Sequence, residues 1–160
     1  MSQTTLSPAE IAAIHRLRES WPRPEAAAVD ALYLVQENHG WIDDQRLEAV
    51  AELLGLSPAY LDSLATFYPL IHRKPVGRRV IRYCDSVCCW QQGAEELAAA
   101  LRARLGIAEG ETTPDGAITL LSHPCLGACH QAPAALVNDR LVTHLSPERL
   151  DRLLEDGDGD

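Results

Sequence analysis

The sequence has no long apolar run and no excess of basic residues. Nowhere do its 160 residues offer an uncharged apolar stretch long enough to cross a bilayer. The first ten residues also lack the basic and apolar segments of a secretion signal. With a formal net charge of −9, the chain has no basic face to neutralise nucleic-acid phosphates. We therefore expect a cytoplasmic protein that neither inserts into a membrane nor binds nucleic acid.

Two common cofactor and redox motifs are missing as well. No glycine-rich loop follows a strand and opens a helix, so neither a dinucleotide-binding fingerprint nor a P-loop is present. The C-x-x-C spacing of a thioredoxin-type dithiol is absent, although the chain has five cysteines. We therefore expect no nucleotide or flavin site within this chain, and we assign no catalytic residue to it.

The first half of the chain has helical periodicity. A capping box at residues 7–10 begins a helix that should end before the WPRP segment. A second helix is expected over about residues 25–38, a third should end at Gly55, and a fourth should begin at Ser57. Residues 1–75 are therefore predicted to form a helical bundle.

In the second half the periodicity changes. The order of predicted elements is strand, helix, strand, strand, helix, with a hairpin between the last two strands. This β-α-β-β-α order predicts a small sheet covered by helices, and the whole chain falls in the α+β or α/β class. The expected domains are a helical bundle at residues 1–75, a sheet domain at residues 76–155 and an acidic tail at residues 156–160.

The five cysteines fall into two groups. Cys84, Cys88 and Cys89 directly follow the first predicted strand, and Cys125 and Cys129 follow the second. The fold can bring the two loops together at one end of the sheet, where four thiolates would converge. Thiols stay reduced in the cytosol, so close groups of cysteines favour metal binding or redox chemistry over disulfides.

The cysteine spacing favours a wide metal centre. Cys84 forms C-x4-C with Cys89 or C-x3-C with Cys88, and Cys125 forms C-x3-C with Cys129. Structural zinc usually takes C-x2-C pairs, whereas a 2Fe-2S cluster has two irons that each bind two thiolates and suits longer loops. Zinc remains the alternative, and spacing alone leaves open whether Cys88 or Cys89 is the ligand.

Residues near the two groups suit an anionic centre. A helix beginning near Gly93 should point its N-terminal N–H groups at the first group. Gly127 allows a tight turn and a close backbone approach to sulfur. His123 and His130 are expected to be surface or supporting groups and not ligands. Three arginines lie upstream of the first group, and they either tune the reduction potential of the centre or form a solvated strand face: Arg78, Arg79 and Arg82.

Two long segments carry a family resemblance: GRRVIRYCDSVCCWQQGAEEL and GETTPDGAITLLSHPCLGACHQAPAALVNDRLVTHLSPE. With the upstream segments VQENHGWID and LGLSPAYLDSLATFYPLIHRKPVG, they resemble the thioredoxin-like 2Fe-2S subunit of bacterial respiratory complex I, the NADH-quinone oxidoreductase. The resemblance covers about residues 26–154. It implies a thioredoxin-like domain in which Cys84, Cys89, Cys125 and Cys129 bind one 2Fe-2S cluster. Many family members lack a cysteine at the position of Cys88, which leaves the role of this thiol undefined.

The resemblance also implies a function. The chain would be an electron-transfer subunit of NADH-quinone oxidoreductase, whose cluster exchanges electrons with FMN in a partner subunit that binds FMN and NADH. It would act as an enzyme only within that complex, peripheral to the cytoplasmic face of the inner membrane. Two alternatives stay open: the equivalent diaphorase subunit of an NAD-linked hydrogenase or formate dehydrogenase, and a zinc-stabilised interaction module without redox activity.

The helical half is a candidate docking surface. Aromatic residues concentrate at interfaces, and the alternative is that they form the core of the bundle, above all Trp41 and Phe67. The candidate anchors are Trp21, Trp41, Tyr60, Phe67 and Tyr68.

Overall fold

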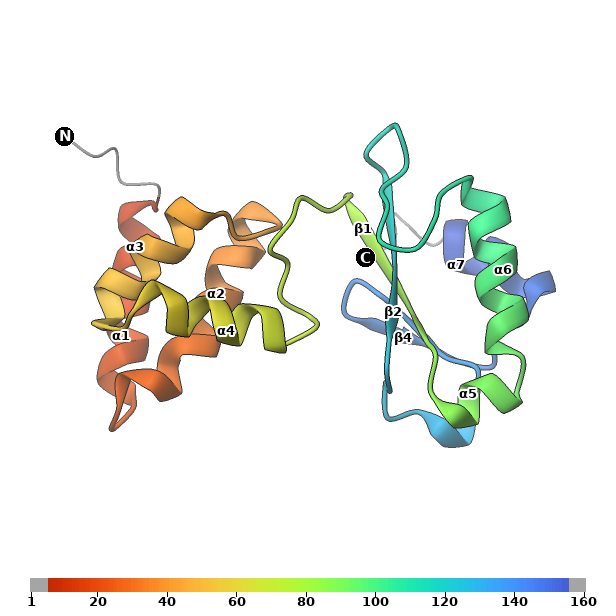
Figure 1. Ribbon diagram of the computed structural model, residues 1–160, viewed down its shortest axis with the longest axis horizontal. Helices are drawn as coiled ribbons and strands as arrows, with labels where there is room; N and C mark the ends of the chain where they lie inside the picture. The colour runs from red at the N-terminus through yellow and green to blue at the C-terminus, as the bar shows by residue number, and fades with distance from the viewer. Residues whose placement is uncertain (1–5, 156–160) are drawn as a thin grey trace. The chain divides into compact units, whose positions relative to one another are not determined.

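The chain divides into two compact units. The computed structural model describes residues 6–155, and the boundary between the units lies between Pro75 and Val76 (Figure 1). The first unit contains four helices and the second a sheet with its own helices. The acidic tail expected at residues 156–160 lies outside the described residues.

The first unit is a bundle whose helices begin and end at the capping residues that the sequence indicates. The Ser7 hydroxyl accepts the N–H of Glu10, and the Glu10 carboxylate accepts the N–H of Ser7, which completes the capping box. Gly40 and Gly55 end the second and third helices with positive φ angles. The helices are α1 (Pro8–Ser20), α2 (Pro24–His39), α3 (Asp44–Leu54) and α4 (Pro58–Phe67).

Apolar side chains from all four helices form one core. Ile14, Leu32, Val50 and Leu61 are fully buried, one from each helix in order. Helical spacing places such residues on one face of each helix, so burial of these faces holds the bundle together.

Glu10 is a buried polar group in this unit. Its carboxylate lies 2.9 Å from the His39 ring and accepts the side-chain N–H of Asn38 at 3.2 Å. Burial alone would raise the pKa of Glu10, but the hydrogen bonds from Ser7 and the neighbouring His39 outweigh it and lower the pKa. The carboxylate therefore joins the start of α1 to the end of α2.

The second unit is a four-stranded mixed sheet with helices. The strand order is β2-β1-β3-β4, with β1 parallel to β2 and the other pairs antiparallel. Short 3-10 turns cover Cys129–Gln131 and Pro147–Arg149. The elements are β1 (Arg79–Cys84), α5 (Val87–Gln91), α6 (Ala94–Leu105), β2 (Ile118–His123), β3 (Ala135–Val137), β4 (Arg140–Val142) and α7 (Leu150–Glu155).

Helices α6 and α7 cover one face of this sheet (Figure 1). Leu97 and Leu101 of α6 and Leu153 of α7 are fully buried against Ile81 of β1 and Leu120 of β2. The second unit therefore has a hydrophobic core of its own, built from residues distant in sequence.

The observed element order differs from the predicted one in two places. The sheet has four strands where the predicted β-α-β-β-α order has three, because the hairpin contributes both β3 and β4. A short helix, α5, follows closely on the end of β1, with Ser86 as its N-cap, and it carries both Cys88 and Cys89. The prediction that the first cysteine group lies on a loop is wrong, since Cys84 ends β1 and Cys89 is helical. Five residues are too few to show a 3.6-residue period, which explains the omission.

The segment that joins the two units is anchored at both of its ends. Arg73 donates to Asp62 at 2.8 Å and to Asp44 at 2.6 Å, both in the first unit. The backbone N–H of Gly77 donates to the Thr119 hydroxyl at 2.6 Å in the second unit. Residues 74–76 lie between these two anchors.

Candidate metal centre

The two parallel strands deliver the cysteines to one end of the sheet. Cys84, the last residue of β1, is in register with His123, the last residue of β2. The segments that follow both strands therefore emerge at the same end, where α5 and the 3-10 turn at Cys129–Gln131 lie (Figure 1). The predicted convergence of the two cysteine groups follows from this register.

Two of the thiols form a buried pair. Cys84 and Cys89 are 3% and 1% exposed and pack with Ala94, Ala128 and Ala134. Burial raises the pKa of Cys89 to about 11, and the adjacent Cys84 thiol acts in the same direction. Without a metal ion, Cys89 is therefore protonated at neutral pH, and metal binding here must release its proton.

The other pair is exposed. The sulfur atoms of Cys125 and Cys129 lie 4.0 Å apart at the surface. The pKa of Cys129 is raised by the hydrogen bond and charge of Cys125 and then by those of Cys88. Cys89 also interacts electrostatically with Cys129, so the buried and exposed pairs are neighbours.

Backbone N–H groups already point at sulfur in both pairs. The N–H of Gly127, whose φ is +75°, donates to the Cys125 sulfur at 3.4 Å. The backbone of Ala134 hydrogen-bonds to the Cys89 thiol, which lowers its pKa against the effect of burial. Such donors stabilise thiolate sulfur in an anionic centre, so the residues present fit an iron–sulfur cluster. Sequence reasoning anticipated Gly127 but missed Ala134, which reaches the site only through the tertiary fold.

The thiols are arranged two and two. Among residues 6–155, no three His, Cys, Asp or Glu side chains are grouped so that they could hold a metal ion. A structural zinc site needs four ligands around one ion, whereas each iron of a 2Fe-2S cluster takes two thiolates. Two pairs of thiols match the two thiolates that each iron of such a cluster takes.

Cys88 and the two histidines lie in the segments that carry the two pairs of thiols. Cys88 is partly buried, and its side chain interacts with that of Cys129. The ring of His123 accepts the backbone N–H of Cys125 at 3.3 Å, and the exposed His130 ring contacts the side chain of Gln131. His123 therefore helps to fix the loop that carries Cys125.

The upstream arginines are not all solvated. Arg82 is only 3% exposed, so the interpretation of a solvated strand face is wrong for this residue. Arg79 donates to the backbone carbonyls of Leu153 and Leu154 at 2.6 Å each, near the end of α7. Arg79 thus has a structural role in docking α7, in line with the preference for cations at helix C-termini.

A thioredoxin-like sheet domain with two cysteine pairs gathered at one end of the strands is the architecture of an iron–sulfur electron carrier. The chain belongs to the thioredoxin-like [2Fe-2S] ferredoxin family, whose model matches residues 14–158. The match includes all five cysteines and nearly all of both units.

Curated relatives cover almost the same length. The chain is 43% identical over 150 residues to the E subunit of NADH-quinone oxidoreductase from Escherichia coli (strain K12), covering 94% of this chain and 90% of that protein. It is 39% identical to the protein of the same name from Pseudomonas aeruginosa, with the same coverage. These similarities confirm the family resemblance that the sequence motifs indicate.

A solved structure shares the fold. A chain of an NAD+-reducing [NiFe]-hydrogenase in the air-oxidized state superposes with a TM-score of 0.64 at 27% identity. The match covers 97% of this chain but only 24% of the hydrogenase chain. Together with the family match, it confirms the α+β class with a thioredoxin-like domain, and the family confirms one 2Fe-2S cluster as the cofactor.

No helix among residues 6–155 is long and apolar enough to cross a membrane.

Proposed function

We propose that this chain is the electron-transfer subunit of an NADH-quinone oxidoreductase, with Cys84, Cys89, Cys125 and Cys129 as the ligands of its 2Fe-2S cluster. The observation that carries the proposal is the arrangement of these four thiols as two pairs at one end of the sheet. The similarity over nearly the whole chain to the E subunit of NADH-quinone oxidoreductase from two organisms supports it. The chain is a subunit of an oxidoreductase complex.

The two pairs give the site a buried side and an open side. Cys84 and Cys89 lie among alanine side chains that exclude water, and Cys125 and Cys129 are exposed. A 2Fe-2S cluster, when bound, takes up and releases one electron at a time. The exposed pair leaves that side of the site accessible to a partner.

The partner follows from what the sequence lacks. Nicotinamide transfers a hydride, so a group that converts two-electron into one-electron transfer must lie between NADH and a 2Fe-2S centre. This chain has no dinucleotide-binding fingerprint. We infer that FMN and NADH are bound by a partner subunit and that the chain reaches the cytoplasmic face of the inner membrane through the complex.

A second candidate is the diaphorase subunit of an NAD-linked hydrogenase. The structural similarity to the hydrogenase chain favours it, although this chain spans only about a quarter of that chain's length. The subunits that copurify with the native protein would distinguish the two candidates.

The test is spectroscopic. The purified chain should be red-brown when oxidised, hold about two irons per chain and give a spin-one-half EPR signal after dithionite reduction. A colourless, EPR-silent protein that contains zinc would contradict the proposal.

A further inference from the structure

A cleft of about 220 Å³ lies beside the buried cysteine pair, between the end of β1 and the helices α5 and α6. Clefts that hold drug-sized ligands measure roughly 300–1,000 Å³, so this one suits a single side chain better than a cofactor. Its lining residues are Tyr83, Asp85, Trp90, Ala94, Glu95, Ala98 and Arg102.

Small side chains on α6 create the space. Ala94 and Ala98 are four residues apart, so they lie on one face of the helix and leave room above it. Trp90 forms a wall of the cleft and is 59% exposed. Its indole N–H donates to the Glu95 carboxylate at 3.3 Å, which holds the ring beside that acid.

The exposed charged residues in the lining are acidic. Asp85 and Glu95 are both exposed, and neither forms an ion pair within the described part of the chain. The only cation in the lining, Arg102, lies eight residues beyond Ala94, about 12 Å along α6. Its charge acts on Tyr83 and Glu109. The cleft thus combines an exposed indole, hydrogen-bonded to Glu95, with two carboxylates that form no ion pair within the described residues.

We propose that this cleft receives an arginine side chain from the flavin-binding partner subunit. The guanidinium group would stack on the Trp90 ring and form an ion pair with Glu95 and Asp85, since a planar cation matches both an aromatic face and a carboxylate. The negative charge of Asp85 and Glu95 identifies the occupant as a basic side chain. The proposal rests on the proposed function, because Trp90 directly follows Cys89 and a subunit that exchanges electrons must approach this end of the sheet.

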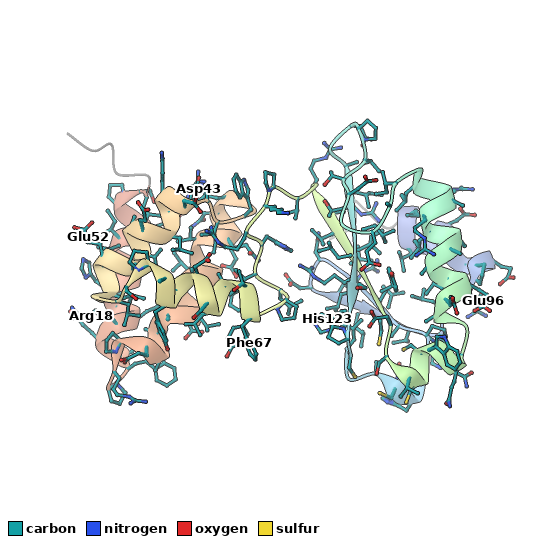
Figure 2. All side chains as sticks on the ribbon, in the orientation of Figure 1. Arg18, Asp43, Glu52, Phe67, Glu96 and His123 are labelled. Carbon is teal, nitrogen blue, oxygen red and sulfur yellow. The ribbon has the colours of Figure 1, made fainter. Side chains whose placement is uncertain are left out.

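The test measures the affinity of the full cluster-containing chain for the flavin subunit. Trp90→Ala and Glu95→Gln should each raise Kd about 5- to 30-fold. The effect of Glu95→Gln should shrink at high salt, because exposed charges are screened. The matched control is Glu96→Gln, which removes an exposed acid one residue away that does not line the cleft (Figure 2). We expect this control to bind like the unaltered chain.

Cluster content is measured for each variant by iron analysis and EPR. If Trp90→Ala lowers the iron content, Glu95→Gln and its salt dependence decide the result. Unchanged Kd for Glu95→Gln, or equal weakening by Glu96→Gln, would overturn the arginine site while leaving the proposed function intact. Absence of an EPR signal, or of binding to the flavin subunit, from the unaltered chain would instead reject the proposed function.

Discussion

At the scale of single residues, the five thiols differ in their surroundings. Cys84 and Cys89 are enclosed by alanines, whereas Cys125 and Cys129 face solvent and Cys88 is partly buried beside Cys129. Metal ligands must be deprotonated, and a buried thiol is the harder one to ionise without a metal. Burial raises the pKa of Cys89 to about 11, so iron binding there must displace the proton of this thiol.

The first prediction concerns Cys88 and Cys89. Cys88→Ser should leave the iron content and the EPR signal nearly unchanged, because Cys84 pairs with Cys89. Cys89→Ser should lose most of the iron, since it removes one of the two thiolates for one iron. Iron analysis of both purified variants is the measurement. Equal loss from the two variants would reassign the ligand to Cys88.

The meeting of the two cysteine groups at one end of the sheet was predictable from the sequence, but the surroundings of the thiols were not. Cysteine spacing and the two preceding strands were enough to expect that both groups meet at one end of the sheet. The Ala134 backbone at Cys89 and the burial of Arg82 depend on strand pairing across distant segments, because β3 pairs with β1. No local pattern in the sequence reports such contacts.

At the scale of elements, the helices of the first unit depend on their caps and on their buried faces. Ser7, Asp43 and Ser57 each accept a backbone N–H in the first turn of their helices. These caps satisfy N–H groups that would otherwise lack partners. Such signals are local, and this is why the four helices could be predicted closely while the short helix α5 could not.

The second prediction concerns the Glu10 cap. Glu10→Gln should lower the free energy of unfolding by about 1–2 kcal/mol, because it removes a buried charge-assisted hydrogen-bond acceptor and weakens the capping box. Urea unfolding followed by circular dichroism measures it. The exposed Glu19→Gln on the same helix is the control and should change stability by less than about 0.5 kcal/mol.

The same variant has a defined pH dependence. The pKa of Glu10 is lowered below its ordinary value of 4.5 on folding, so its contribution is fully present above that value. The contribution is lost as the pH falls through the lower pKa of the folded state. The stability difference between the unaltered chain and Glu10→Gln should therefore shrink in acid. A difference that grows as the pH falls would contradict the role assigned to the carboxylate.

The third prediction compares two apolar residues of α4. Leu61 is fully buried, so Leu61→Ala should cost about 2–5 kcal/mol in urea unfolding. Phe67 is 77% exposed and projects from α4 (Figure 2), so Phe67→Ala should cost less than about 0.5 kcal/mol. A large loss of stability from Phe67→Ala would contradict its exposure.

The prediction that Phe67 belongs to the core of the bundle is wrong, because its side chain is exposed. Its role as a docking anchor stays a prediction.

At the scale of the whole molecule, the chain consists of two units with separate cores. All five cysteines lie in the second unit, together with every strand of the sheet. The change from helical periodicity to alternating strands near residue 76 made this division visible in the sequence. Periodicity does not indicate what each unit does within a complex, because it reports burial inside the chain and not contacts with other chains.

The fourth prediction follows from the separate cores. A fragment of residues 76–160 should fold alone and give the same EPR signal and iron content per chain as the full chain, because its core draws on its own residues. The matched control is the same fragment with Cys89→Ser, which should lose most of its iron. A fragment that is soluble but holds no iron would show that the helical unit is needed to complete the site.

The short joint between Arg73 and Gly77 has a consequence for avidity. Four chain steps separate the two anchored residues and span at most about 14 Å. Joining two binding surfaces by a linker this short gives the second contact an effective concentration in the millimolar range once the first has formed. Two individually weak attachments, one from each unit, would therefore combine into a tight one, and severing the joint would abolish that gain without altering either surface.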